Sequence, residues 1–353
     1  MRPDPLSTSP TRDTPEARAP QRARVDTRFL LFLAVVLVVN SHMEAYYPRP
    51  YFAGDGLIGY ALFFFVSGLG LALSAKRGTR SFFQYYYRRI LRIYPTVWLV
   101  VIPEAIVTGA ILTFSAGDFV SRFVWPTHNT FVGPIMIDYA LLYLALLPRS
   151  ARFIAGTIAA LAVPAVFIWI KVGHLGNGIY QDPLGIHLAT IANFEAMLLG
   201  AYFGFRLPER LATFRRDTAL LVVTLLAYIA LKYSFIGGHH KSLYPTLYLL
   251  TFAMLYWLLR MACSTGLESL LGRLRPVAFV INLLGVCCLE AYFVQDLVVV
   301  HWKGLATALP CPLNVIALWC LVIPGSYVLE RLASWARTGF RKLSWRLDTS
   351  AAA

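Results

Sequence analysis

The sequence RFLLFLAVVLVV, residues 28–39, is an apolar run that ends at the polar sequence NSH, residues 40–42. A second apolar run follows after a short polar connection and carries FFFVSG, residues 63–68. It leads into the basic sequence RRILRIYP, residues 88–95. Ionisable side chains are costly in lipid and mark functional sites by default. This segment therefore predicts two membrane spans with a histidine at one end and clustered arginines at the other.

The composition extends this prediction to the whole chain. Of its 353 residues, 58% are hydrophobic and 14% are charged, whereas soluble proteins carry roughly 25% charged residues. Apolar windows of about 20 residues, the length that crosses a bilayer as a helix, recur along the sequence. They lie at about 29–47, 57–75, 94–114, 131–148, 152–171, 186–205, 217–236, 243–262, 276–300 and 312–330. The predicted fold class is an all-α integral membrane protein, a bundle of about ten transmembrane helices.

The net charge of +14 follows from membrane topology. With the N-terminus in the cytoplasm, all but six of the 32 Lys and Arg residues fall in inner loops or tails, as the positive-inside rule requires. A nucleic-acid partner would need a basic soluble face, and none is visible, so none is expected. The sequence predicts a multi-pass membrane protein, surrounded by membrane lipids, with both termini in the cytoplasm.

Three regions are expected. Residues 1–26 are rich in Pro, Arg, Ser and Thr and predict a disordered cytoplasmic tail. Residues 27–332 form the membrane domain, and residues 333–353 are predicted to be a basic cytoplasmic tail.

The five cysteines lack metal-binding spacing. His239 and His240 are adjacent but have no third ligand at a fixed spacing, so a solvated loop and no metal are expected.

His42 is the first candidate catalytic residue. It follows Arg28 by 14 residues, roughly 21 Å along a helix, which places it near the outer membrane boundary. A neutral imidazole there could take a proton from a hydroxyl, and Glu44 or Asp55 could orient it. The alternative is an ordinary helix-end histidine at the polar interface.

Arg88, Arg89 and Arg92 form the second candidate group. Arg88 and Arg92 share one face of a helix, and guanidinium groups suit phosphate oxygens. An acyl-CoA carries several phosphates. The alternative is an ordinary cluster of positive charge on the inner side, as multi-span proteins have.

Glu290 is the third candidate, because a carboxylate inside a span needs a partner or water. It could face a cavity near His42 and act there. The alternative is a structural pair with an intramembrane Gln, Tyr or His. Asp138 and Glu195 are weaker candidates of the same kind.

The order of these features resembles the membrane-bound acyltransferase-3 family. The resemblance rests on His42, on FFFVSG at residues 63–68 and on RRILRIYP at residues 88–95. LEAY at residues 289–292 is similar to the motif in the family's penultimate span, and GPI at residues 133–135 matches more loosely. The resemblance covers roughly 27–332.

The chain departs from the family's pattern at two positions. Phe32 stands where the family often has an arginine, about ten residues before the histidine, and Arg28 lies one helical turn earlier. Met136 stands near the position of a tryptophan that is common early in the fourth span.

The resemblance implies transfer of an acyl group, commonly acetyl, from a cytoplasmic acyl-CoA to a hydroxyl of an extracytoplasmic glycan or polysaccharide. His42 would be the general base. The arginines Arg88, Arg89 and Arg92 would hold the phosphates of acetyl-CoA, and Ser67 would line the passage between the two sides. No metal is implied.

A transporter or exporter of a small anionic or acylated solute is the alternative from another class. Intramembrane carboxylates such as Glu290 and Asp296 would suit proton coupling. Against it, no inverted repeats are evident. The sequence also contains no P-loop, GxSxG or HExxH motif in a workable context.

Overall fold

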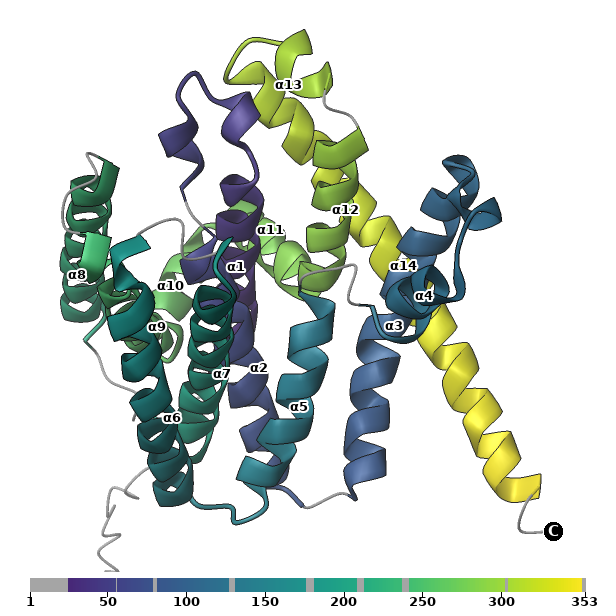
Figure 1. Cartoon of the computed structure of the whole chain (residues 1–353), viewed down its shortest axis with the longest axis horizontal. Helices are drawn as coiled ribbons and strands as arrows, with labels where there is room; N and C mark the ends of the chain where they lie inside the picture. Colours follow the sequence, from purple (N-terminus) through teal and green to yellow (C-terminus); the bar gives the residue numbers. More distant parts are fainter. Residues whose placement is uncertain are drawn as a thin grey trace, which may run out of the picture.

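The computed structural model describes residues 25–54, 56–78, 81–126, 131–175, 181–207, 213–236, 241–301 and 304–350, and this part of the chain is helical without strands (Figure 1). The all-α prediction is confirmed. The helices are α1 (Thr27–Ser41), α2 (Leu57–Ala75), α3 (Phe82–Val107), α4 (Ala116–Phe119), α5 (Val132–Leu146), α6 (Ala151–Val172), α7 (Pro183–Phe205), α8 (Phe214–Ile236), α9 (Thr246–Ala262), α10 (Thr265–Arg273), α11 (Arg275–Val286), α12 (Cys288–His301), α13 (Gly304–Ala308) and α14 (Leu313–Ser350).

Within the described residues, six helices are long and apolar enough to cross a membrane, or up to eight if each of two bent helix pairs is one span. The protein is therefore a multi-pass membrane protein. The expected total of about ten is not confirmed, because two of the expected spans coincide with α1 and α5, apolar helices of only 15 residues each.

The exposed surfaces of the outer helices indicate the environment that surrounds the protein. Val163, Phe167 and Ile170 of α6 and Val223 and Leu226 of α8 are exposed. Both helices lie on one side of the bundle, opposite α14 (Figure 1). Apolar surface of this extent is unfavourable in water. It is the surface that a helix presents to lipid.

Helix α2 is the central element, and glycines bring its neighbours close. A Cβ atom at Gly68 would lie 1.8 Å from the carbonyl oxygen of Met197 on α7, and one at Gly200 would lie 1.9 Å from that of Phe65. Gly59 is also tight against Val38 of α1. Small residues allow such approach between helices in lipid.

A sharp bend interrupts the region predicted as the span 276–300. Helices α11 and α12 meet at 83° around Cys287. Gly285, just before the bend, lets α11 lie close to α1, because a Cβ atom there would lie 2.4 Å from the backbone oxygen of Arg28. Arg92 donates a hydrogen bond to the carbonyl of Val286, at 3.4 Å, at the exposed end of α11. Hydropathy alone did not indicate this bend.

Helix α14 runs past the predicted domain end at residue 332 without a break. Ala333 is buried, and the Phe340 ring packs against Trp98 of α3 with 6.0 Å between ring centroids. At the other end of the domain, the Asp26 side chain caps α1 by accepting from the backbone of Arg28 and Phe29. The three predicted regions remain predictions.

Candidate functional site

His42 directly follows the last residue of α1 and is partly exposed. The neighbouring Asn40 shapes the connection that follows. Its side-chain amide donates to the carbonyls of Phe52 and Ala53, at 3.1 and 2.6 Å, and its oxygen accepts from the Tyr47 hydroxyl at 2.6 Å. Asn40 therefore holds the loop between α1 and α2 against the end of α1, beside His42. Sequence reasoning gave Asn40 no role.

The charges around His42 come from two elements. Desolvation by neighbouring atoms lowers the pKa of His42 below its ordinary value, while Asp296 of α12 and Glu44 act in the opposite direction. Glu44 is exposed at the start of a short 3-10 helix, Glu44–Tyr46. The imidazole is thus neutral near pH 7 and can accept a proton. Asp296 is the carboxylate with the larger effect on it. Asp55 lies outside the described residues.

Arg89 is on α3 and lies near the C-terminal end of α2, whereas His42 lies near the other end of that helix. It lines a cavity of about 40 Å³ together with Ser74, Tyr85 and Tyr143. Its guanidinium lies 5.8 Å from the ring centroid of Tyr139 on α5. This cavity is small but contains an aromatic wall and a cation, the pair of features that suits a flat or phosphorylated group.

Tyr139 connects Arg89 to Ser67. The Tyr139 hydroxyl donates to Ser67 Oγ at 3.5 Å, and the Tyr139 carbonyl accepts from the Tyr85 hydroxyl at 3.0 Å. The structure therefore brings two of the predicted site residues, Arg89 and Ser67, to one tyrosine on α5. Arg88 is exposed on α3.

Glu290 forms the buried centre of a charged cluster. Its side chain is 0% exposed and lies in the first turn of α12, where the helix dipole favours a negative charge. Glu290 Oε1 accepts a hydrogen bond from the Thr96 hydroxyl at 3.0 Å. It also lies 3.6 Å from Arg92 Nη1 and 3.7 Å from Arg337 Nη1.

This placement bears on two hypotheses about Glu290. The structural-pair hypothesis named Gln, Tyr or His as partner, whereas the partners are arginines and a threonine. The other hypothesis places Glu290 in a cavity near His42, but the carboxylate of α12 that acts on His42 is that of Asp296. It lies six residues, about 9 Å, further along the helix. A catalytic role of Glu290 stays a prediction.

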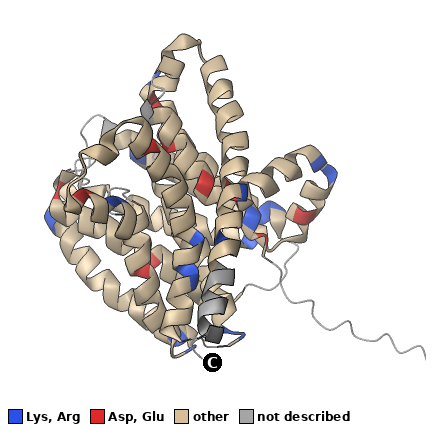
Figure 2. Cartoon of the chain, turned by 90° about the vertical axis from the view of Figure 1, so that its right-hand side faces the viewer, with Lys and Arg blue, Asp and Glu red and all other residues tan. Residues whose placement is uncertain are grey.

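Arg337 is a residue that sequence reasoning missed. Its Nη2 donates to Glu330 Oε1 at 2.7 Å, seven residues earlier on α14. Charged side chains are sparse among the helices (Figure 2), so Arg92, Glu290, Glu330 and Arg337 form an unusual concentration of charge. The spacing of Glu330 and Arg337, two helical turns, was a signal that they share a face.

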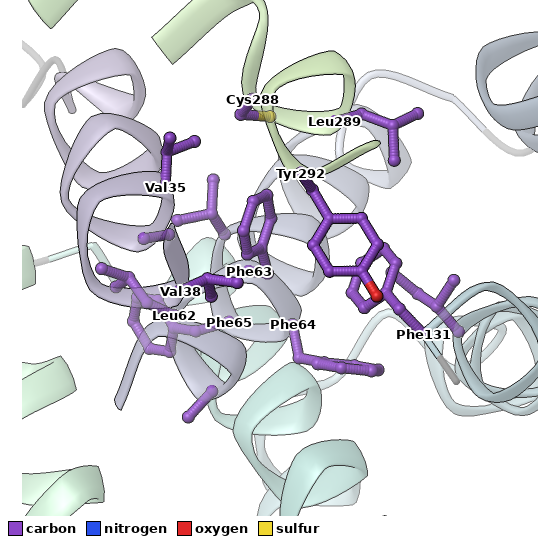
Figure 3. Packing of buried hydrophobic residues seen from close by; sticks show 14 of the residues in the cluster. Val35, Val38, Leu62, Phe63, Phe64, Phe65, Phe131, Cys288, Leu289 and Tyr292 are labelled. Carbon is purple, nitrogen blue, oxygen red and sulfur yellow. The ribbon is translucent and has the colours of Figure 1, made fainter. Parts of the chain in front are cut away.

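Aromatic rings pack between the His42 end and the Arg89 end. The Phe131 ring lies 5.7 Å from Phe63, 5.8 Å from Phe64 and 5.5 Å from Tyr292, centroid to centroid. Figure 3 shows Phe63 and Phe64 of α2 near Phe131, just before α5, and Tyr292 of α12. A space of about 10 Å³ remains beside them. It shares no lining residue with the Arg89 cavity.

The weaker candidates occupy separate places. Asp138 and Glu195 are buried on α5 and α7, and each has one carboxylate oxygen without a hydrogen bond to the described residues. Asp138 lines an apolar cavity of about 400 Å³ formed by α5, α6 and α7. His239 and His240 lie outside the part of the chain that the structure describes.

A comparison with protein families finds one match that covers most of the chain. The model of acyltransferase family 3, described as an acyltransferase domain, matches residues 29–331. Searches of curated proteins and of solved structures gave no match. The matched range contains His42, Arg89 and Glu290 but ends before Arg337.

Proposed function

Because the chain belongs to acyltransferase family 3, we propose that this membrane acyltransferase moves an acyl group, acetyl in the first instance, from acyl-CoA to a hydroxyl of a glycan or polysaccharide. The enzyme class follows from the family, and the donor, the acyl group and the acceptor are the proposed parts. The observation that supports this proposal best is the family match over residues 29–331. The matched range has His42, whose pKa is lowered by desolvation, at one end of the α1–α2 hairpin and a cavity lined by Arg89 at the other.

The proposed donor site is the inner end of α3. Arg88, Arg89 and Arg92 follow one another within about one turn of this helix, and guanidinium groups bind phosphate oxygens in a forked geometry. The Arg89 cavity, with Tyr85 and Tyr143 in its wall, supports this assignment.

The proposed acceptor site is around His42. The neutral imidazole would take the proton of the acceptor hydroxyl, whose oxygen would attack the thioester carbonyl. The acyl–oxygen bond forms as the carbon–sulfur bond breaks, and the thiolate of CoA leaves. Glu44 and Asp296 would stabilise the imidazolium that results. This is transfer without a covalent acyl-enzyme.

The thioester would reach His42 along α2. Ser67 marks the middle of that route, and the rings of Phe63, Phe64 and Phe131 fill its outer part. Transfer therefore requires these rings to move when the donor binds. Tyr139, which contacts both Arg89 and Ser67, links donor binding to that region.

The proposed location is the bacterial inner membrane, with the arginine end of α3 toward the cytoplasm. The excess of Lys and Arg in the predicted inner loops supports this orientation.

Purified protein in liposomes tests the proposal. Acetyl-CoA loaded on the arginine side should lose its thioester only when a glycan is present on the His42 side, and mass spectrometry should find the acyl group on that glycan. His42→Ala should lower the rate at least about a hundredfold, the usual contribution of a general base. Solute flux without thioester cleavage would contradict the proposal and favour a transporter. Unchanged acylation by His42→Ala would remove His42 as the base.

A further inference from the structure

Arg337 lies outside the residues that the family model matches, yet its side chain reaches the buried carboxylate of Glu290. The match ends at residue 331, and α14 continues to Ser350. Figure 1 shows α14 as a long helix that passes beside α12 and α3. The Arg337 side chain is 11% exposed and contacts Glu290 on α12.

We propose that Arg337 is a positioning residue that neutralises Glu290 and thereby keeps Arg92 available to the phosphates of the donor. This inference rests on the proposed function, because it assigns Arg92 to the donor site. It adds a residue from beyond the matched domain to that site.

Burying the charge of Glu290 costs free energy. A carboxylate without solvent loses several kcal/mol unless opposite charges and hydrogen bonds compensate. The compensation converges on one oxygen, Glu290 Oε1, from Thr96, Arg92 and Arg337. Glu290 Oε2 has no hydrogen-bond partner among the described residues, so the carboxylate depends strongly on both arginines.

The two arginines that contact Glu290 differ in how firmly they are held. Arg337 is anchored by its 2.7 Å bond to Glu330 and is nearly buried. Arg92 is 38% exposed, and its contacts to Glu290 and Val286 are long, at 3.6 and 3.4 Å. A guanidinium has five N–H donors, so most of those on Arg92 remain for a ligand. Arg337 is the fixed counter-ion and Arg92 is the one with an open side.

The charges of the four clustered side chains are balanced. Arg92 and Arg337 offset Glu290 and Glu330, so the four side chains sum to zero. Without Arg337, Arg92 would be the only positive charge left among these four side chains. Coulomb attraction at low dielectric would then draw Arg92 inward, away from the open side.

Kinetics of Arg337→Gln test this role. The apparent KM for acetyl-CoA should rise about tenfold with a smaller change in kcat, as expected for a displaced binding group. Arg331→Gln removes the same charge from an exposed position on the same helix and should leave KM unchanged. Arg337→Lys, which keeps the charge, should recover part of the loss.

Two combined variants separate positioning from general damage. If Arg337 acts through Arg92, Arg337→Gln should add nothing to KM in an Arg92→Gln protein. Glu330→Gln should partly rescue Arg337→Gln, because it restores the balance between Arg92 and Glu290. Thermal unfolding in detergent identifies variants that fail to fold, and for these the Lys variant provides the measurement.

The outcomes distinguish the two proposals. If Arg92→Gln raises KM while Arg337→Gln and Arg337→Lys match the wild type, this inference is wrong and the proposed function stands. Additive effects of the two arginine variants also overturn it. If Arg92→Gln itself leaves KM unchanged, Arg92 is not in the donor site and both assignments fail.

Discussion

His42 can accept a proton only while its ring is neutral. Desolvation lowers its pKa below the ordinary value near 6.5, and Asp296 partly opposes that effect. The active form is therefore present at neutral pH, and activity should fall as the pH drops through the lowered pKa. Asp296→Asn removes a charge that raises this pKa, so the acid limb of kcat/KM should move to still lower pH.

A pH–rate profile of the purified enzyme measures this shift. Asp118→Asn is the matched control, because Asp118 is an exposed carboxylate whose side chain bonds locally to Ser115. An acid limb that stays in place in Asp296→Asn would show that another group sets it.

Arg89 should matter for the donor and not for the acceptor. Charge-assisted hydrogen bonds contribute about 1.5–3 kcal/mol each, so Arg89→Ala should raise the KM for acetyl-CoA about ten- to a hundredfold. The KM for the glycan should remain unchanged. Arg273→Ala, at an exposed arginine of α10, is the control. Equal changes in both KM values would argue against a donor-specific role.

At the scale of helices, the α2–α7 crossing is the contact least tolerant of added volume. Gly68→Ala would place a methyl group on the backbone of Met197, and overpacking costs about 1–3 kcal/mol or more. Gly70 lies two residues further along the same helix, and a methyl group there would have no described atom beyond its own helix within 4 Å. Gly70→Ala should be neutral or slightly stabilising.

Unfolding temperature in one detergent compares the two variants directly. Gly68→Ala should unfold at a clearly lower temperature than Gly70→Ala. Similar temperatures would mean that the two helices separate easily, and that close approach at Gly68 contributes little to stability.

Hydropathy located most helices but did not indicate how the helices pack against one another. Long apolar runs locate α2, α6, α7 and α8, because crossing lipid demands length and composition that few other structures need. The bend at Cys287 escaped prediction, since hydropathy reports the composition of a span and not the direction of its axis.

The charged cluster escaped prediction for a related reason. Thr96 and Glu290 are 194 positions apart, and hydropathy does not determine how two helices are rotated about their axes. His42, Arg89 and Ser67 could be singled out because they lie in one short segment whose order resembles a family. Arg337 could not, because it lies where both the apolar pattern and that resemblance end.

At the scale of the whole molecule, the proposed mechanism requires His42 and Arg89 to face different compartments. A cysteine at Ala45 should react with a membrane-impermeant maleimide in intact spheroplasts, because it lies beside His42. A cysteine at Arg77, past the other end of α2, should react only after permeabilisation. Cys311 and Cys320 are exposed and are replaced by serine in both proteins.

Labelling of both positions in intact spheroplasts would contradict the orientation. Labelling of Arg77→Cys alone would invert it, and the arginines would then meet a compartment without acyl-CoA. The chain with Cys311 and Cys320 replaced and no cysteine added is the blank for both measurements.

The bend between α11 and α12 also fixes the direction in which the side chains of the first turn of α12 point. Within the first turn after Cys287, the chain must present Glu290 to guanidinium groups from two other helices. Each residue turns an α-helix by about 100°, so one residue inserted after Cys288 would rotate this carboxylate away from both. Side chains in this turn can vary in kind, but the number of residues in it is constrained by the angular position of a single oxygen atom.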